Sequence, residues 1–353
     1  MTPIKKLQGR LPESVDCLLV TNEKNQRYLT GLNYTDGYVV ICREKAFLLA
    51  DFRYIEVAKR YESDELTVIM LGGANGGLNA VFTDNGCKNI GFEDGSMTVA
   101  TLERLKKAYP DVNFVPCGGH IEEMRVSKTE TEVENIIKAQ RIAEKALERL
   151  FTLMKPDMTE IEVALELEYG MRLYGAEKTS FDTIAVSGTA SSLPHGEPRP
   201  IKLEKGFLTM DFGALYNGYC SDMTRTVVIG KADGEMKKVY NTVLQAQLAA
   251  LDFVAAGKSG RDCDKIARDI IYNAGYEGCF GHSLGHGVGM YIHEEPRLAS
   301  SWDKPLEVGA IVTVEPGIYI EGKYGVRIED MVWLGEDGPV NLTKAPKEML
   351  ELF

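Results

Sequence analysis

Two aspartates flank a predicted hairpin turn, where their carboxylates could hold a cation together. The turn is Asn217-Gly218, a dipeptide typical of tight β-hairpins. Depending on the length of the connection, Asp211 and Asp222 lie diagonally on one side of the hairpin or face each other. Two carboxylates this close repel unless a cation lies between them or one holds a proton. The hairpin alone is equally consistent with a structural role for both residues, in which one aspartate belongs to the turn and the other pairs with Arg225.

Two glutamates belong to apolar, β-branched runs further along the chain. Glu315 follows Thr313 and Val314, and Glu329 lies inside the run 326–332. A carboxylate buried in such a run is unstable unless it meets a cation or takes up a proton. The alternative for Glu329 is an ion pair with Arg327, which strand alternation places on the same face.

A glycine-rich segment between these two regions holds three of the five histidines of the chain, His282, His286 and His293. Its glycines leave room for a ligand to approach the backbone. The segment lacks the Lys-Ser/Thr ending of a phosphate-binding loop, and no nucleophile-elbow pattern accompanies it. Such crowding of histidines indicates a chemical site more than core packing.

The four carboxylates and one histidine would form an oxygen-rich ligand set. Hard ligands of this kind favour Mn²⁺ or a similar ion over a thiolate-type zinc site, and four negative charges suit two divalent ions better than one. Two neighbouring metal ions can share and acidify a water molecule, and they can polarise a carbonyl oxygen. The residues therefore predict hydrolysis of an amide bond.

The composition restricts the class of protein. The 353 residues favour two domains, and 44% hydrophobic with 26% charged residues are typical of a globular chain. A net charge of -12 argues against nucleic acid as a partner. The seven cysteines form no C-x-x-C pair, which suits a reducing compartment, and no stretch approaches the ~20 apolar residues of a membrane span. We expect a cytoplasmic protein without a membrane segment.

The first part of the chain predicts a modest α/β domain over residues 1–124. Short β-rich runs at 16–20, 38–42, 46–50, 67–71 and 89–92 alternate with helical patterns at 53–62 and 98–108.

The second part, residues 125–353, predicts helix pairs beside β-hairpins. Capping boxes at Ser127/Glu130 and Thr159/Glu162 each begin a helix, and later helices are expected at 234–256 and 260–274. Strands are expected at 182–187, 207–213, 219–229, 309–314 and 325–334. Two helices and a hairpin thus occur twice, which predicts an internal pseudo-twofold symmetry in a mixed α/β (α+β) fold.

Six motifs, taken in order, resemble the signature of the pita-bread metallopeptidases. They are D-F-G from Asp211, S-D-M-T-R from Ser221, G-H-S-L-G-H-G-V-G from Gly281, H-E-E-P from His293, V-E-P-G from Val314 and G-V-R-I-E-D from Gly325. The resemblance is to the proline-specific branch, which contains aminopeptidase P and prolidase. It covers residues 125–353, and by size, position and the segment 25–31 the first unit is similar to a creatinase-type N-terminal domain.

The resemblance implies a role for each site residue. Asp211, Asp222, His286, Glu315 and Glu329 would bind two divalent metal ions, most simply Mn²⁺, with Co²⁺ or Zn²⁺ as alternatives. Asp222 and Glu329 would bridge the ions, and Glu315 would serve as general acid/base for the bridging water. The remaining residues would contact substrate: His195 and His293 at the tetrahedral intermediate, His282 near the proline ring, and Arg327 at the bridging glutamate and the substrate end. A structural role is the alternative for His195 and His282.

The implied activity is hydrolysis of an Xaa-Pro bond by a homodimeric enzyme. An Xaa-Pro bond lacks the N–H that ordinary exopeptidases grip, so it needs a dedicated site. We expect an Xaa-Pro aminopeptidase, with an Xaa-Pro dipeptidase (prolidase) as the alternative. A silent binding module of the same fold would have lost ligands, and none is lost; methionine aminopeptidase normally lacks H-E-E-P and the large first domain.

Overall fold

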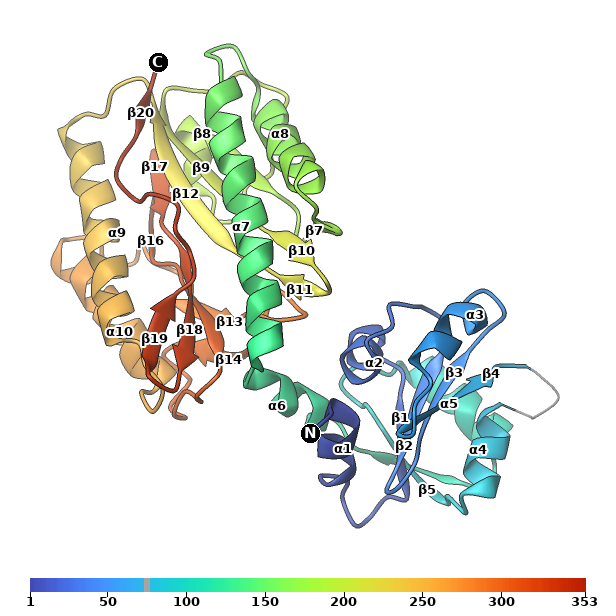
Figure 1. Cartoon of the computed structure of the whole chain (residues 1–353). Coiled ribbons are helices and arrows are strands. Elements are labelled where there is room, and N and C mark those ends of the chain that lie inside the picture. Colours follow the sequence, from blue (N-terminus) through green and yellow to red (C-terminus); the bar gives the residue numbers. More distant parts are fainter. Residues whose placement is uncertain (73–76) are drawn as a thin grey trace. The chain divides into compact units, whose positions relative to one another are not determined.

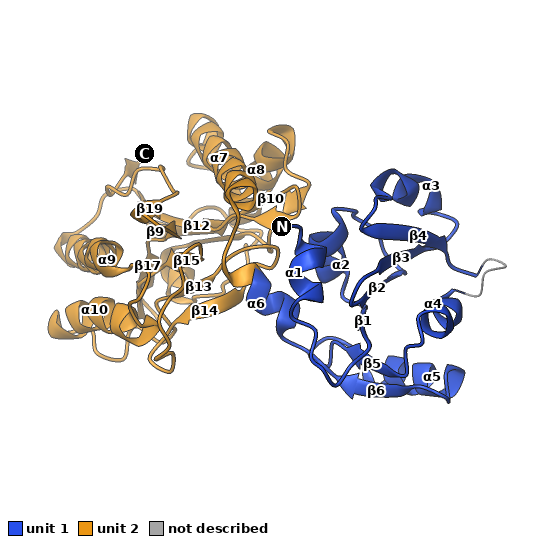
Figure 2. Ribbon diagram, turned by 60° about the horizontal axis from the view of Figure 1, so that its bottom comes forward, with its two compact units in different colours: residues 1–124 blue, residues 125–353 orange. Residues whose placement is uncertain are grey.

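The computed structural model describes residues 1–72 and 77–353, which form two compact units. Unit 1 comprises Met1–Met124 and unit 2 comprises Arg125–Phe353 (Figure 2). Within the described residues, none of the helices is both long and apolar enough to cross a lipid bilayer.

Unit 1 is a mixed six-stranded sheet with short helices on its faces (Figure 1). The strand order is β4-β3-β2-β1-β5-β6, antiparallel at β1–β2 and β2–β3 and parallel elsewhere. Its strands are β1 Cys17–Val20, β2 Tyr38–Cys42, β3 Ala46–Ala50, β4 Leu66–Met70, β5 Asn89–Phe92 and β6 Asn113–Pro116. Its helices are α1 Pro3–Gln8, α2 Glu23–Thr30, α3 Ile55–Ala58, α4 Leu78–Asp84 and α5 Val99–Ala108, while α6 His120–Val126 crosses into unit 2.

Successive side chains along the strands of unit 1 point to opposite faces of the sheet and pack into two separate hydrophobic cores. Leu18 and Val20 belong to one hydrophobic cluster, whereas Cys17 and Leu19 belong to the other. The predicted strands of this unit are therefore confirmed to within a residue. The helical pattern at 53–62 is shorter than expected, because α3 ends at Ala58 and a 3-10 turn follows at Lys59–Tyr61.

Unit 2 holds four long helices and two main sheets (Figure 1). The helices are α7 Glu130–Leu153, α8 Glu160–Leu173, α9 Gly234–Phe253 and α10 Gly260–Asn273. One sheet has the order β20-β12-β9-β8, from Glu351–Leu352, Met223–Ile229, Gly206–Phe212 and Ile184–Ser187. The other has the order β14-β13-β15-β18-β19, from Glu294–Leu298, Gly285–Gly287, Ile311–Val314, Asp330–Gly335 and Gly338–Asn341. Small sheets add β7 Lys178–Thr179, β10 Ala214–Tyr216 and β11 Tyr219–Cys220, and the pair β16 Gly317–Ile320 and β17 Tyr324–Arg327.

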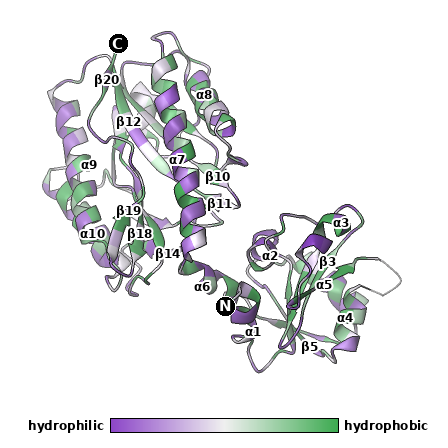
Figure 3. Cartoon of the chain, viewed as in Figure 1, coloured by the Kyte–Doolittle hydropathy of each residue, from purple (hydrophilic) through white to green (hydrophobic). Residues whose placement is uncertain are grey.

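The two halves of unit 2 repeat the same arrangement. Helices α7 and α8 share a core with β9 and β12, and helices α9 and α10 share a core with β15 and β18. Hydrophilic and hydrophobic bands alternate along α7 and α9 (Figure 3), as expected for helices that bury one face. The predicted mixed fold with an internally repeated second domain is confirmed.

One of the two predicted capping boxes is wrong. Helix α7 is capped by Thr129, whose hydroxyl accepts from the Glu132 N–H at 3.4 Å, and not by Ser127 with Glu130. Ser127 instead donates its hydroxyl hydrogen to the carbonyl of Val308, and the backbone N–H of Lys128 bonds to the Gly309 carbonyl at 2.9 Å. These tertiary contacts hold residues 127 and 128 outside the helix. The second box, Thr159 with Glu162, is confirmed.

The strand predicted at 325–334 is also wrong as one element. It breaks at Ile328 and Glu329, so that β17 pairs with β16 whereas β18 pairs with β15. The break places Glu329 at the junction between two sheets.

Candidate active site

A cavity of about 660 Å³ in unit 2 brings all nine sequence-predicted site residues together. The lining includes Asp211, Asp222, His286, Glu315, Glu329, His195, His282, His293 and Arg327. A cavity of this size fits a small peptide. Residues from both halves of unit 2 meet here, so neither half forms the site alone.

The two aspartates come from the first hairpin. The turn Asn217-Gly218 has positive φ at both residues, 47° and 82°, and a two-residue connection joins β10 to β11. Beyond it, Asp211 in β9 lies opposite Thr224 in β12. Asp222 is therefore diagonal to Asp211, which is the first of the two registers that the sequence allowed.

His286, Glu315 and Glu329 come from the second half. His286 lies in β13, which approaches β15 so closely that a side chain on the preceding Gly285 would meet the Thr313 carbonyl at 2.0 Å. The Thr313 hydroxyl accepts from the His286 N–H at 3.0 Å and donates to Glu315 Oε1 at 3.1 Å. His286 Nε2 lies 3.3 Å from Glu315 Oε1 and 3.6 Å from Asp222 Oδ2.

The carboxylates repel one another in a poorly hydrated space. Burial raises the pKa of Asp222 well above its ordinary value, and the charges of Glu329 and Asp211 raise it further. Burial and the charge of Glu315 likewise raise the pKa of Glu329 well above its usual range. For Glu315 itself burial acts to raise the pKa, but the hydrogen bond and charge of His286 outweigh it and lower the pKa to about 2.

These residues fit a divalent cation. One ligand atom each from Asp222, His286 and Glu329 lie within 4.8 Å of one another, and all three residues are buried. Asp211 Oδ1 is buried and has no hydrogen-bond partner among residues 1–72 and 77–353, which leaves a lone pair free for an ion. A bound cation would remove the repulsion that raises the two pKa values.

Both simple ion pairs considered as alternatives are wrong. Arg327 Nη2 binds Asp211 Oδ2 at 2.7 Å and not Glu329. Arg225 binds Asp330 Oδ1 at 2.8 Å and neither of the two cavity aspartates. The break before β18 explains the first result, because it ends the strand alternation that would place Arg327 beside Glu329.

The three other histidines line the cavity in different ways. His195 and His293 are exposed at its surface, and the His293 ring lies edge-on to His286 with centroids 4.3 Å apart. Partial burial and the neighbouring His286 lower the pKa of His293 to about 4. His282 is more buried, and its Nε2 lies 2.9 Å from the Tyr319 hydroxyl.

The loop that carries His195 is anchored by a buried carboxylate. Glu160, at the start of α8, is fully buried. It accepts hydrogen bonds from the Ser187 N–H at 2.6 Å and from Arg199 Nε at 2.8 Å, on either side of the loop. The loop is thus closed at its base.

Three residues of the site escaped the sequence analysis. The Thr224 hydroxyl donates to Glu329 Oε2 at 2.6 Å, and the Tyr319 hydroxyl accepts from Arg327 Nη1 at 2.8 Å. Arg297, in β14, is exposed and lines the cavity. Thr224 could have been suspected because it follows Asp222 at the strand spacing of two. No local signal distinguishes Tyr319 or Arg297 from the other tyrosines and arginines of the chain.

Comparison with known proteins identifies both units. The model of "Metallopeptidase family M24" matches residues 134–336, and that of "Creatinase/Prolidase N-terminal domain" matches residues 3–127.

Similar proteins carry two activity names. An Xaa-Pro dipeptidase of Pyrococcus horikoshii is 38% identical over 96% of this chain and 95% of its own length. The structure of an Xaa-Pro dipeptidase from Bacillus anthracis matches with a TM-score of 0.94 at 40% identity, covering 99% of both chains. That of an X-Pro aminopeptidase from Thermotoga maritima matches with a TM-score of 0.91 at 37% identity, covering 98% of this chain and 100% of the other.

Proposed function

Because this chain belongs to metallopeptidase family M24, among relatives named as Xaa-Pro peptidases, we propose that it is an exopeptidase that hydrolyses the Xaa-Pro bond at the N-terminus of peptides. The observation that carries the proposal is the buried cluster of Asp222, His286 and Glu329 in the wall of a cavity large enough for a short peptide.

The family implies divalent metal ions, and we propose that two are bound per chain, most simply as Mn²⁺, with Co²⁺ and Zn²⁺ as alternatives. Asp211, Asp222, His286, Glu315 and Glu329 would hold them. When bound, such ions supply an acidified water as nucleophile and polarise the scissile carbonyl.

The chain's own residues then handle protons and position the substrate. Glu315 Oε1 lies 3.3 Å from His286 Nε2, among the candidate ligands, where its carboxylate would accept a proton from the attacking water and later return it. The proline nitrogen needs that proton, because a secondary amine leaves more readily than its anion. His195 and His293, at the surface of the cavity, would donate hydrogen bonds to the oxygen that gains negative charge. Arg327 binds Asp211 at 2.7 Å and lines the cavity, where it would also contact the end of the substrate.

A second candidate, the Xaa-Pro dipeptidase, is favoured by Arg297. Arg297 lines the same cavity, and a guanidinium is a suitable partner for the free carboxylate of a bound dipeptide. A longer peptide carries no charge at that position. Arg297 is therefore the observation that keeps the dipeptidase as the second candidate beside the aminopeptidase.

Hydrolysis of matched peptides tests these proposals. Protein stripped of metal and reloaded with Mn²⁺ is assayed with an Xaa-Pro dipeptide, an Xaa-Pro-Yaa tripeptide and an Xaa-Ala control, beside the Glu315→Gln variant. We expect Xaa-Pro cleavage that requires Mn²⁺ and is lost in the variant. Cleavage of the dipeptide alone supports the dipeptidase, cleavage of the tripeptide supports the aminopeptidase, and activity on neither would refute the proposal.

Two further expectations remain predictions. No disulfide joins the seven cysteines, all of which lie within residues 1–72 and 77–353, as a reducing compartment favours, so we propose a cytoplasmic location. A homodimer is proposed from the resemblance, and light scattering on the purified protein would test it.

A further inference from the structure

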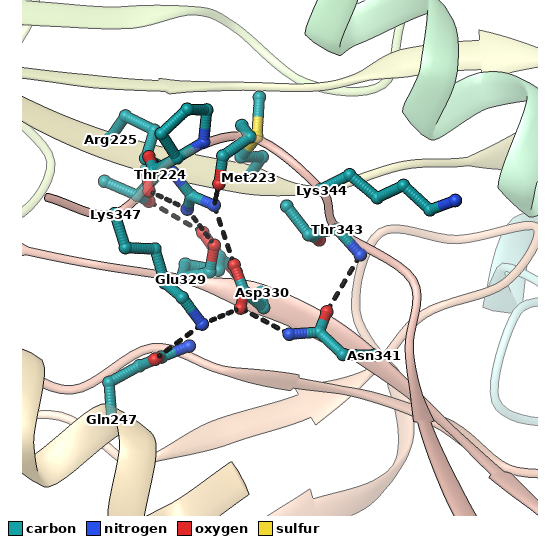
Figure 4. Close-up of polar contacts among 12 residues, drawn as sticks. Met223, Thr224, Arg225, Gln247, Glu329, Asp330, Asn341, Thr343, Lys344 and Lys347 are labelled. Carbon is teal, nitrogen blue, oxygen red and sulfur yellow. Dashed lines mark hydrogen bonds and ion pairs between the residues drawn. The ribbon is translucent and has the colours of Figure 1, made fainter.

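A largely buried polar network lies next to Glu329 (Figure 4). Asp330, which follows Glu329, is at its centre and is fully buried. Asp330 does not line the cavity, whereas Glu329 does. The other side chains of the network are Arg225, Gln247, Asn341 and Lys347.

Arg225 uses every N–H of its guanidinium. Nη1 donates to the backbone carbonyls of Thr224 at 2.9 Å and Glu329 at 2.6 Å. Nη2 donates to Asp330 Oδ1 at 2.8 Å and to the Ala345 carbonyl at 2.7 Å, and Nε donates to the Pro346 carbonyl at 2.8 Å. One side chain therefore joins three segments that lie far apart in the sequence.

Asp330 completes the link to the last of these segments. Its Oδ2 accepts from Lys347 Nζ and from Asn341 Nδ2, both at 2.7 Å. Lys347 Nζ also lies 3.2 Å from Gln247 Oε1, on α9. With Arg225 on one oxygen and Lys347 on the other, this buried carboxylate is fully paired.

Two of the backbone carbonyls that Arg225 binds belong to residues of the candidate metal centre. Thr224 and Glu329 are the donor and acceptor of the 2.6 Å hydrogen bond that orients the Glu329 carboxylate. Their carbonyls both accept from the same Nη1, and the Glu329 N–H also donates to the Thr224 carbonyl at 3.2 Å. The planar guanidinium of Arg225 therefore reinforces a direct backbone contact between the two residues.

We propose that Arg225 and Asp330 are positioning residues for the metal centre, and that through them residues 343–347 form part of its support. The inference rests on the proposed function, because it takes Glu329 as a metal ligand. A purely structural ion pair would stabilise the fold equally well, but it would leave the metal affinity of the folded protein unchanged.

The test measures Mn²⁺ affinity of the metal-free full-length protein by titration calorimetry. Arg225→Lys keeps the positive charge beside Asp330, but an ammonium group has three donors and cannot reach all five acceptors. We expect the dissociation constant for Mn²⁺ to rise by about 10- to 100-fold, as is typical when an outer partner of a metal ligand is lost. Circular dichroism at the same temperature establishes that the variant is folded.

A matched control is available in the same unit. Arg268 pairs with Asp264 through Nε at 2.8 Å and also donates to two backbone carbonyls, those of Phe280 and His282. Arg268→Lys removes the same kind of branched guanidinium contact, but from residues that are not candidate metal ligands. It should leave the Mn²⁺ affinity unchanged.

Lys347→Met gives a second test with a milder change, because Lys347 is partly exposed. It removes one donor to Asp330 and should weaken Mn²⁺ binding less than Arg225→Lys does. This variant decides the question if Arg225→Lys does not fold. Wild-type affinity in the folded variants, or equal weakening in Arg268→Lys, would overturn the proposal. Absence of Mn²⁺ binding by the parent protein would instead refute the proposed function.

Discussion

The hydrogen bond between Thr224 and Glu329 offers a sharp test of the metal centre. Thr224 is fully buried; its hydroxyl donates to Glu329 Oε2 at 2.6 Å and accepts from Arg327 Nε at 3.0 Å. Thr224→Val keeps the shape of the side chain but removes both bonds. A hydrogen bond to a charged group contributes about 1.5–3 kcal/mol. Since 1.36 kcal/mol corresponds to a factor of ten, the Mn²⁺ dissociation constant should rise roughly 10- to 150-fold.

Calorimetric titration of the metal-free variants with Mn²⁺ measures this change directly. Thr224→Ser is the matched control, since it retains the hydroxyl and loses only a methyl group. We expect it to bind Mn²⁺ within a few-fold of the parent. If Thr224→Val bound Mn²⁺ as tightly as Thr224→Ser, the hydroxyl would not orient Glu329 for a metal ion, and the reasoning from this contact would be refuted.

Three further predictions follow from the same site. Free Mn²⁺ at 100 times its dissociation constant should stabilise the protein by about 2.7 kcal/mol. For unit 2 this corresponds to a rise in Tm of roughly 5–11 °C, measured by scanning calorimetry. An unchanged Tm would contradict metal binding. The raised pKa values of Asp222 and Glu329 mean that the metal-free fold keeps protons which the unfolded chain releases above its ordinary carboxyl pKa values of 3.8 and 4.5. The free energy of unfolding of the metal-free protein should therefore fall as the pH rises from these values through the raised pKa values, and the stabilisation by Mn²⁺ should grow. The Tm measured with Mn²⁺ should exceed the Tm without it by more at pH 7.5 than at pH 5. The same difference at both pH values would contradict this prediction. Arg297→Met should raise KM for an Xaa-Pro dipeptide about tenfold and leave a tripeptide nearly unaffected, in steady-state assays; equal effects on both peptides would remove Arg297 as the carboxylate contact.

Local patterns in the sequence predicted part of the grouping of the nine site residues, and the family resemblance supplied the rest, above all His195, which lies in none of the six motifs. The turn Asn217-Gly218 fixes the hairpin that brings Asp211 and Asp222 to one side, and its register follows from a two-residue connection. The β-branched runs around Glu315 and Glu329 signal burial, and the six motifs place these residues in a known order.

The partners of the charged residues could not be predicted from sequence. Arg327 pairs with Asp211 across two sheets, and Arg225 pairs with Asp330, because the strand breaks at Ile328 and Glu329. A run of apolar residues gives no sign of such a break, since apolar residues continue on both sides of Ile328 and Glu329. Pairing of this kind depends on where strands end in three dimensions.

The start of α7 shows the same limit on a smaller scale. Ser127 and Thr129 each have a glutamate three residues later, so both satisfy the capping pattern. The structure selects Thr129 because Ser127 and Lys128 bond to residues 308 and 309. Contacts distant in sequence decide between two equal local signals.

The short strand β20 has a consequence for how the chain avoids aggregation. Val228 and Ile229 of β12 pair with Glu351 and Leu352, and the Val228 N–H bonds to the Leu350 carbonyl at 2.8 Å. Until these residues are synthesised and docked, β12 is an edge strand with unsatisfied N–H and C=O groups beside an apolar face. Such an edge recruits strands from other molecules. In the finished fold, residues 350–352 pair with the last two residues of β12, so a strand of two residues protects that end of a seven-residue strand from the neighbouring copies that a crowded cell supplies.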